Sequence, residues 1–184
     1  MHKPEPRRLL DAAKIDLILN RLACQLIENH RDFKETVLIG LQPRGVMFAN
    51  RIIQLLQQTY GIEEVAYGIL DTTFFRDDFR RQEKTLLANT SRMEVQVEGK
   101  NIVLIDDVLY TGRSIRAALT AIDTFGRPSS IELMVLVDRR FSRHLPIQPD
   151  YKGAQIDALQ GDKVRVEWTF EQGEDCVYLI SKDQ

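Results

Sequence analysis

One stretch constrains the fold of this chain more than any other: Asn101–Ser114, with the sequence NIVLIDDVLYTGRS. Its first part, Asn101–Ile105, is one asparagine followed by four aliphatic side chains without polar alternation, the pattern of a strand buried on both faces of a parallel sheet. Asp106 and Asp107 follow directly, so two carboxylates are expected at the carboxyl end of the strand, where open α/β sheets bind ligands. The sequence therefore predicts an α/β fold with its site at this strand end.

A polar loop comes next, TGRS at Thr111–Ser114. It leads into Ile115–Phe125, where apolar residues recur at the spacing of a helix that ends before Gly126. The loop offers hydroxyl groups, a glycine that lets a ligand approach the backbone, and the N–H groups of a helix N-terminus, a combination that binds phosphate. Strand, acidic pair, loop and helix together predict a pocket for a phosphorylated sugar.

The two adjacent carboxylates need a partner. Their mutual repulsion raises one pKa unless a cation or hydroxyl donors compensate, and hard cations prefer oxygen ligands. Asp106 and Asp107 are therefore expected to hold Mg²⁺ or sugar hydroxyls. The alternative is an acidic pair that merely opens a helix at the surface, because a short motif alone has low specificity.

A second strand–loop–helix unit lies earlier in the chain. Thr36–Leu41 has the pattern of a buried strand and Val46–Tyr60 that of a helix. The loop between them consists of Gln42, Pro43, Arg44 and Gly45. Its guanidinium beside a helix start suits a phosphate group, although a plain proline turn explains the loop nearly as well. Either peptide bond of the Leu41–Gln42–Pro43 segment is a candidate for the cis form.

Other apolar runs complete the alternation of helices and strands. A helix is expected over residues 11–29 with Asp11 as its cap. Further strands are expected at Val65–Leu70, Ile131–Val137, Val164–Phe170 and Cys176–Ile180, the last two closing the sheet or its edge. Residues 141–158 are rich in proline and polar residues, which predicts a loop that covers the sugar site as a hood. The fold class is α/β, with a mainly parallel central sheet flanked by helices.

The long segment Asp71–Glu98 is a candidate for a mobile lid, because loops above about 15 residues are uncommon unless they are functional. The cations that it would close over an anionic substrate are Arg76, Arg80, Arg81 and Lys84. The alternative is a solvent-exposed hairpin, with Met93, Val95 and Val97 alternating along its second arm.

Composition limits the classes of protein. The 184 residues, 43% of them hydrophobic, suffice for a single domain over residues 1–184 with a substantial core. The 25 basic and 27 acidic residues leave a net charge of −2, which provides no overall attraction to nucleic acid. The first residues lack the apolar core of a signal peptide and no membrane-length apolar run occurs, so a cytoplasmic protein is expected.

The central stretch VLIDDVLYTGRSIRAAL at 103–119 resembles the phosphoribosyl pyrophosphate signature of the type I phosphoribosyltransferases. Within that family the chain is most similar to the pyrimidine operon regulators that are also uracil phosphoribosyltransferases. The similarity is carried as well by IGLQPRG at 39–45, TFFRDD at 73–78, GRPSSIELMVLVDR at 126–139 and LPIQPDYKG at 145–153. Where those regulators typically have VDRG followed by HRELP, this chain reads VDRRFSRHLP, so Arg140 replaces a glycine and one residue is added.

The resemblance implies the conversion of uracil and phosphoribosyl pyrophosphate to uridine monophosphate and pyrophosphate, with Mg²⁺ as cofactor. The residues implied for the ribose and its 5′-phosphate are Asp106, Asp107, Val108, Leu109, Tyr110, Thr111, Gly112, Arg113 and Ser114. Those implied for pyrophosphate are Gln42, Pro43, Arg44, Gly45 and Arg76, and those for the base are Val137, Asp138 and Arg139.

Among these residues, the resemblance and the charge development of the reaction make Asp107 and Arg76 the expected catalytic residues. The candidates for direct or water-mediated contact with Mg²⁺ are Asp106, Asp107 and Asp138. From its place after a strand alone, Asp138 is equally expected to be a salt-bridge partner at the surface.

Some members of the family also bind a leader RNA. Basic residues form three clusters, which consist of Arg7 and Arg8, of Arg21, His30, Arg31 and Lys34, and of Arg139, Arg140 and Arg143. A symmetric homo-oligomer would bring two copies of such a cluster together. The alternative is that these cations are solvated or paired with nearby acids. Three functions therefore stay open: a transferase for uracil or for a purine base, a non-enzymatic RNA-binding attenuator that senses nucleotide, and an unrelated phosphate-binding module.

Overall fold

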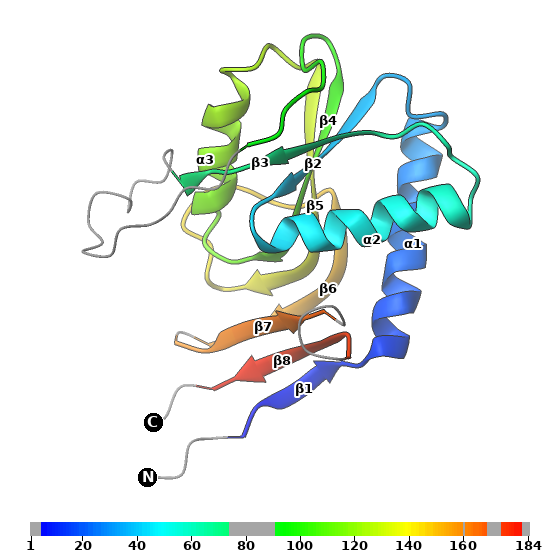
Figure 1. The fold of residues 1–184 in the computed structure, drawn as a ribbon. Helices are drawn as coiled ribbons and strands as arrows, with labels where there is room; N and C mark the ends of the chain where they lie inside the picture. The colour runs from blue at the N-terminus through cyan, green and yellow to red at the C-terminus, as the bar shows by residue number, and fades with distance from the viewer. Residues whose placement is uncertain (1–4, 74–90, 160, 169–173, 182–184) are drawn as a thin grey trace.

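A parallel five-stranded sheet forms the centre of the molecule (Figure 1). In the computed structural model, which describes residues 5–73, 91–159, 161–168 and 174–181, its order is β3-β2-β4-β5-β6. The strands are β2 (Thr36–Leu41), β3 (Ala66–Leu70), β4 (Asn101–Leu109), β5 (Ser130–Arg140) and β6 (Tyr151–Asp157). The predicted α/β class with a mainly parallel sheet flanked by helices is confirmed.

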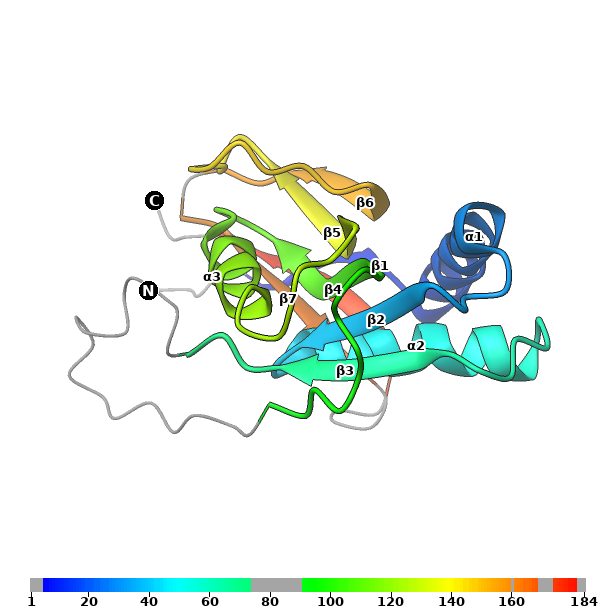
Figure 2. The same cartoon turned by 90° about the horizontal axis from the view of Figure 1, so that it is seen from above.

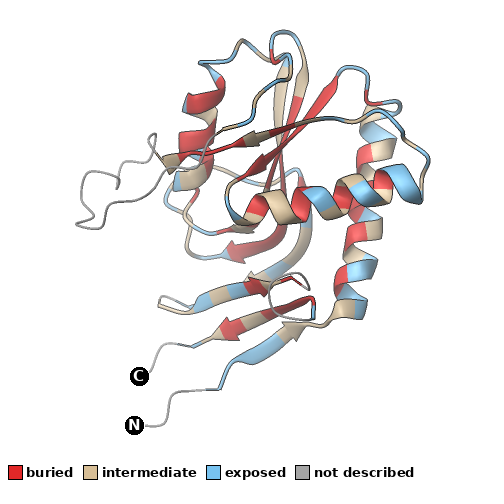
Figure 3. Ribbon diagram, in the orientation of Figure 1, coloured by how far each residue is buried: buried red, intermediate tan, exposed pale blue. Residues whose placement is uncertain are grey.

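Helices cover both faces of this sheet (Figure 2). On one face, α1 (Ala12–His30) and α2 (Arg44–Gln58) share a hydrophobic cluster with strand residues such as Leu38, Val103 and Met134. On the other face, α3 (Arg113–Ile122) packs with Ile39 and Leu104. The two clusters use alternate strand residues because successive side chains of a strand point to opposite faces. Figure 3 shows the buried residues concentrated in the strands and on the sheet-facing sides of the helices.

Helix α1 begins where the sequence indicated. The carboxylate of Asp11 accepts a hydrogen bond of 2.9 Å from the backbone N–H of Lys14, which is the geometry of an N-cap. The buried residues Ile15, Leu19 and Leu26 recur at helical spacing along its inner face. Local sequence signals therefore determine both the start and the orientation of this helix.

Two central strands are longer than expected. β4 continues to Leu109 and β5 to Arg140, so the charged residues at 106–107 and 138–139 lie inside strands rather than after them. Asp106 is paired with Val135, and Leu109 with Asp138. The prediction ended each strand where hydrophobicity ends, but backbone pairing with the neighbouring strand continues regardless of side-chain polarity. The charged side chains are consequently held on a rigid sheet.

The prediction of a continuous loop over residues 141–158 was wrong in its second half. β6 lies there and pairs in parallel with β5 along the edge of the sheet. Arg21 of α1 donates hydrogen bonds to the carbonyls of Lys152 and Gly153, at 3.1 and 2.6 Å, and so helps to cover this strand. The flanking prolines and polar residues concealed the strand, because its partners come from elsewhere in the chain.

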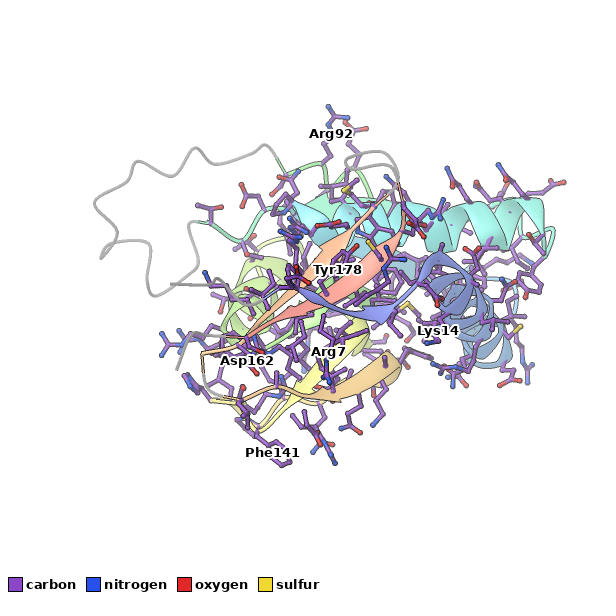
Figure 4. The ribbon with its side chains drawn as sticks, turned by 90° about the horizontal axis from the view of Figure 1, so that it is seen from below. Arg7, Lys14, Arg92, Phe141, Asp162 and Tyr178 are labelled. Atoms are coloured by element: carbon purple, nitrogen blue, oxygen red, sulfur yellow. The ribbon has the colours of Figure 1, made fainter. Side chains whose placement is uncertain are left out.

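A separate antiparallel sheet is formed by strands from both ends of the chain. Its order is β1-β8-β7, with β1 (Arg7–Leu10), β7 (Lys163–Glu167) and β8 (Cys176–Ile180). The two C-terminal strands were expected to close the main sheet, and this was wrong; β1 was not anticipated. Val166 of β7 and Val177 of β8 belong to the hydrophobic cluster that α1 and α2 cover. Figure 4 shows this sheet from below, with Tyr178 labelled on its middle strand β8.

The lid expected over residues 71–98 lies largely outside the described part of the chain, since residues 74–90 include all four of its cations. In the described portion, Ile69 and Arg92 exchange two backbone hydrogen bonds of 2.9 Å, and Val97 is buried. This single bridge replaces the strand expected along residues 93–97 in the hairpin alternative. No helix within the described ranges is long and apolar enough to cross a membrane.

Candidate phosphoribosyl site

A cavity of about 450 Å³ opens where β4 ends and α3 begins. Its lining residues are Asp106, Val108, Leu109, Tyr110, Thr111, Gly112, Arg113, Ser114, Ile115 and His144. The structure thus gathers every residue predicted for the ribose and 5′-phosphate except Asp107 around one cavity. A polar loop and the start of a helix form most of its wall.

The loop of this cavity turns at Gly112, which caps α3 with a left-handed φ of +89°. A Cβ added at this glycine would lie 3.2 Å from Cδ1 of Ile147 and 3.5 Å from Cβ of Leu145. The segment after β5 therefore presses against the loop, and the N–H of His144 also donates to the carbonyl of Thr111 at 3.0 Å. Because the first N–H groups of a helix have no intrahelical partner, this braced helix start suits an anion.

The two adjacent carboxylates are in different surroundings. Asp106 lines the cavity, whereas Asp107 is 7% exposed and does not line it. The N–H of Asp107 donates to the carboxylate of Asp106 at 3.0 Å. Burial raises the pKa of the Asp107 carboxyl, and the positive charge of Arg44 partly offsets this rise. The acidic pair thus combines one carboxylate at the cavity with one buried beside a cation.

The predicted pyrophosphate loop lies next to this pair. The Gln42–Pro43 peptide bond is the cis one of the two candidates. A Cβ at Gly45 would lie 2.3 Å from the carbonyl oxygen of Ile105, so only glycine allows α2 to start this close to β4. Arg44 donates a hydrogen bond of 2.5 Å to the carbonyl of Val166 in β7. The loop, the acidic pair and the antiparallel sheet β1-β8-β7 therefore meet at the carboxyl end of β4.

Asp138, predicted at the base and the metal, is 5% exposed and forms an ion pair with Arg143. Its second carboxylate oxygen accepts from Gln155 at 3.4 Å, and Arg143 also donates to the carbonyl of Tyr110 at 2.5 Å. Of the two interpretations of Asp138 from its sequence position, the structure shows a salt bridge, although a buried one. The pairing of Asp138 with Arg143 was not predicted, because Arg143 lies in a segment without periodicity.

Arg139 lies on the other side of Tyr110. Its guanidinium carbon is 4.0 Å from the centroid of the Tyr110 ring, and the side chain is only 4% exposed. Burial lowers the pKa of this guanidinium. Val137 is fully buried. A neighbouring cavity of about 390 Å³ is lined by Asp138, Arg139 and Arg143 together with the loop that follows β5.

The acidic side chains at the site are the candidate ligands for Mg²⁺. No group of three or more His, Cys, Asp or Glu side chains that would hold a metal occurs among the described residues. Mg²⁺ is usually held through one or two carboxylates together with waters and substrate phosphates. Asp106 at the cavity therefore fits an ion that arrives with a phosphorylated substrate. Arg76, the remaining residue predicted to contact pyrophosphate, lies outside the described residues.

Comparison with known proteins identifies the family. Residues 7–171 match the phosphoribosyl transferase domain family. The pyrimidine operon regulatory protein of Lactococcus lactis subsp. lactis (strain IL1403) is 38% identical over 177 residues, 96% of this chain and 98% of that protein. The bifunctional protein PyrR of Gloeothece citriformis (strain PCC 7424) is 42% identical over 172 residues, 94% of this chain and 96% of that protein. The chain belongs to the PyrR-like type I phosphoribosyltransferases.

Two solved structures of phosphoribosyltransferases share this fold at lower sequence identity. A hypoxanthine-guanine phosphoribosyltransferase from Bacillus anthracis has a TM-score of 0.67 at 16% identity, covering 97% of this chain and all of that chain. A hypoxanthine phosphoribosyltransferase from Staphylococcus aureus has a TM-score of 0.65 at 20% identity, covering 86% of this chain and 80% of that chain. At such identities the similarity concerns the fold, and it leaves the base specificity of this phosphoribosyltransferase to be argued from its own site.

Proposed function

We propose that this phosphoribosyltransferase converts uracil and phosphoribosyl pyrophosphate to uridine monophosphate and pyrophosphate. The observation that carries the proposal is the meeting of three features at one sheet edge: the cavity at the start of α3, the buried carboxylate of Asp107 and the loop at residues 42–45. The pyrimidine operon named for the Lactococcus lactis relative favours a pyrimidine base.

In this reaction the bond from C1 of ribose to pyrophosphate oxygen breaks and a bond from C1 to N1 of uracil forms, while the N1 proton is released. Positive charge develops on the sugar as pyrophosphate leaves, so negative groups fixed near C1 lower the barrier. Asp107 supplies such a charge when its carboxyl is ionised, and the positive charge of Arg44 favours the ionised form against the effect of burial. Asp106 and the loop at residues 111–114 hold the ribose hydroxyls and the 5′-phosphate.

The proposed pyrophosphate contacts come from Arg44 and its loop, with Arg76 as an additional cation. Mg²⁺, bound through Asp106 and the substrate, would neutralise the charge of the departing pyrophosphate. The base would lie near residues 137–139, reading backbone groups beside Tyr110, whereas the Asp138 side chain is already engaged by Arg143.

Pyrophosphate release in the presence of uracil, Mg²⁺ and phosphoribosyl pyrophosphate tests this proposal, with hypoxanthine and orotate as competing bases. Of the three bases, we expect only uracil to be turned over. The activity should depend on Mg²⁺ and should be lost in the Asp106→Asn variant. Asp150→Asn is the matched control, because Asp150 accepts a hydrogen bond from Leu133 away from the cavity. Turnover with hypoxanthine instead of uracil would assign the chain to the purine transferases.

A second proposed function is binding of a leader RNA with response to uridine monophosphate, which the regulatory and bifunctional names of the relatives favour. Few of the described cations in the basic clusters are left to attract RNA. Several cations of the basic clusters are already engaged: Lys34 with Asp32, Arg140 with Asp157 and Arg8 with Glu174. RNA binding therefore rests on the remaining cations and on a symmetric oligomer that would bring two copies of them together.

Salt titration of binding to the transcript upstream of this protein's own operon tests the second function. A regulator binds that RNA more tightly than a scrambled RNA, loses affinity as salt rises, and responds to uridine monophosphate. Equal, weak binding to both RNAs at moderate salt would leave the chain an enzyme alone.

A further inference from the structure

A separate cavity of about 310 Å³ lies between α2 and the small sheet. Its lining residues are Met47, Asn50, Arg51, Gln54, Trp168 and Asp175. None of them lines the phosphoribosyl cavity or the cavity beside β5. A volume of roughly 300 Å³ is at the lower end of the range for small-molecule pockets, so this space suits a small ligand.

Four of the lining residues form one face of α2. Positions 47, 50, 51 and 54 follow the three- and four-residue spacing of a helix, whereas Phe48 and Ile52 are fully buried in the core. Asn50 and Gln54 are exposed, and their side-chain amides make no hydrogen bond within the described part of the chain. Each amide therefore has both a donor and an acceptor to offer to a ligand.

Trp168 forms the opposite wall, just after β7. Its side chain is 1% exposed, and its ring stacks on Phe48 with 6.1 Å between the ring centroids. The indole N–H is buried and has no acceptor among the residues that the structure describes. Buried donors almost always have a partner, which makes this one unusual. Met47, whose thioether is flexible, also lines the cavity.

The charge in this cavity is already balanced. Arg51 is ion-paired with the buried carboxylate of Asp175, and an oxygen of Asp16 lies 4.0 Å from the same guanidinium. Two carboxylates thus surround one cation, which disfavours a phosphate group. The cavity combines an unpartnered indole N–H, two amides and an apolar methionine, but its described lining residues include no unpaired positive charge.

We propose that this cavity binds a neutral, planar heterocycle with carbonyl oxygens, of the size of a free nucleobase or nucleoside. A carbonyl oxygen accepts from the Trp168 N–H, and the amides of Asn50 and Gln54 match the alternating donors and acceptors of such a ring. Nucleotides are excluded by the carboxylates around Arg51. The chain would then have a site for an unphosphorylated ligand in addition to its phosphoribosyl site.

The chain provides its own probe for this site, because Trp168 is its only tryptophan. We would titrate the protein with uracil, uridine and guanosine while following tryptophan fluorescence, first alone and then with saturating uridine monophosphate and Mg²⁺ to occupy the phosphoribosyl site. The second condition is needed because Arg44 bonds to Val166, two residues before Trp168, so ligands at the phosphoribosyl site can also alter the signal. We expect a saturable change with at least one probe in both conditions.

Substitutions on α2 locate the binding. Asn50→Ala and Gln54→Ala should each weaken the affinity at least fivefold. Gln57→Ala is the matched control on the same helix, because Gln57 does not line the cavity and donates to the carbonyl of Glu63 at 3.4 Å. Trp168→Phe keeps an aromatic ring but removes the N–H, so calorimetric affinity should fall at least fivefold. Its melting temperature should also fall, because the smaller ring leaves a cavity in the core.

Two results would overturn the proposal. One is the absence of a saturable change with all three probes up to millimolar concentration. The other is a change that disappears when uridine monophosphate fills the phosphoribosyl site, since the signal would then come from that site. Neither result depends on whether the chain turns over uracil, and the α2 variants remain informative if Trp168→Phe does not fold.

Discussion

The ends of β4 and β5 begin from the same sequence pattern, an apolar run followed by charged residues, and yet they form different environments. At β4, Asp106 faces an open cavity and the chain continues into a glycine loop and a helix. At β5, Asp138 is buried and paired with Arg143, which lies five residues later in the loop that follows the strand. The open cavity therefore lies at the β4 end, whereas at the β5 end the following loop supplies an arginine to the buried carboxylate.

The two ends are nevertheless connected. Arg143 reaches from the β5 loop to the carbonyl of Tyr110 in the β4 loop, and Arg139 lies under the Tyr110 ring. Residues after and within the end of β5 therefore hold the loop that follows β4 in place. Substitutions at β4 should mainly affect chemistry, and substitutions at β5 should mainly affect stability.

The largest expected effect is on catalysis at β4. Asp107→Asn removes the charge proposed to face the developing sugar cation, so kcat should fall by roughly 10²–10³. Affinity for phosphoribosyl pyrophosphate should change much less, because the lost interaction matters most in the transition state. Single-turnover rates at saturation and equilibrium binding measure the two quantities. Asp123→Asn, at the exposed C-cap of α3, should keep the wild-type rate. An unchanged rate in Asp107→Asn would remove this residue from the chemistry.

The next effect is on stability at β5. Asp138→Asn leaves the Arg143 side chain, 21% exposed, without its counter-ion, and should lower the free energy of unfolding by about 3 kcal/mol. Urea denaturation measures this loss. Asp157→Asn is the control, because it breaks the solvent-exposed pair with Arg140 and should leave the midpoint nearly unchanged. Equal midpoints for the two variants would contradict a stabilising role for the buried pair.

A smaller effect is expected at the loop glycine. Gly112→Ala forces a left-handed backbone on a side chain and brings a Cβ against Ile147, so it should cost about 1–2 kcal/mol of stability and weaken phosphoribosyl pyrophosphate binding. Gly99→Ala is the matched comparison: its φ is +72°, but nothing lies within 4 Å of the added Cβ. This control should lose stability and keep its affinity. If both variants bind equally well, the turn at Gly112 is structural only.

The smallest effect is a pH dependence of stability. The raised pKa of Asp107 means that the folded state binds more protons than the unfolded state once pH exceeds the ordinary Asp value, near 4. The contribution of Asp107 to the free energy of unfolding is therefore fully present below pH 4, roughly, and is lost as pH rises through the folded-state pKa. When urea midpoints of the ligand-free protein are plotted against pH, Asp107→Asn should remove this part of the pH dependence. Parallel pH profiles of the wild type and the variant would show that Asp107 titrates normally.

Much of the fold could be predicted because its signals are local. The buried run of β2, the cap at Asp11 and the turn at Gly112 each depend on residues close together in the chain. The phosphate-binding part of the site follows the same rule, since eight of the nine residues predicted for it are consecutive or nearly so and line one cavity. Such segments require no knowledge of distant partners.

The errors have the opposite origin. β6 was taken for a loop because its pairing is supplied by β5, and β1 was missed because its partner β8 lies at the other end of the chain. Arg143 lies in a segment without a local pattern, and its role depends on Asp138. Trp168 lies in an expected strand, but its place in a cavity depends on one face of α2. No periodicity within a short window contains that information.

By itself, the sequence determined the α/β class and the position of the loop between β4 and α3, because hydrophobic periodicity and turn chemistry act over a few residues. Tertiary structure decided which charges remained available. It placed Asp107 beside Arg44, paired Asp138 with Arg143, and joined both ends of the chain into one small sheet. The physical reason is that burial and electrostatic pairing depend on distance in space, and residues far apart in the chain become neighbours only when it folds.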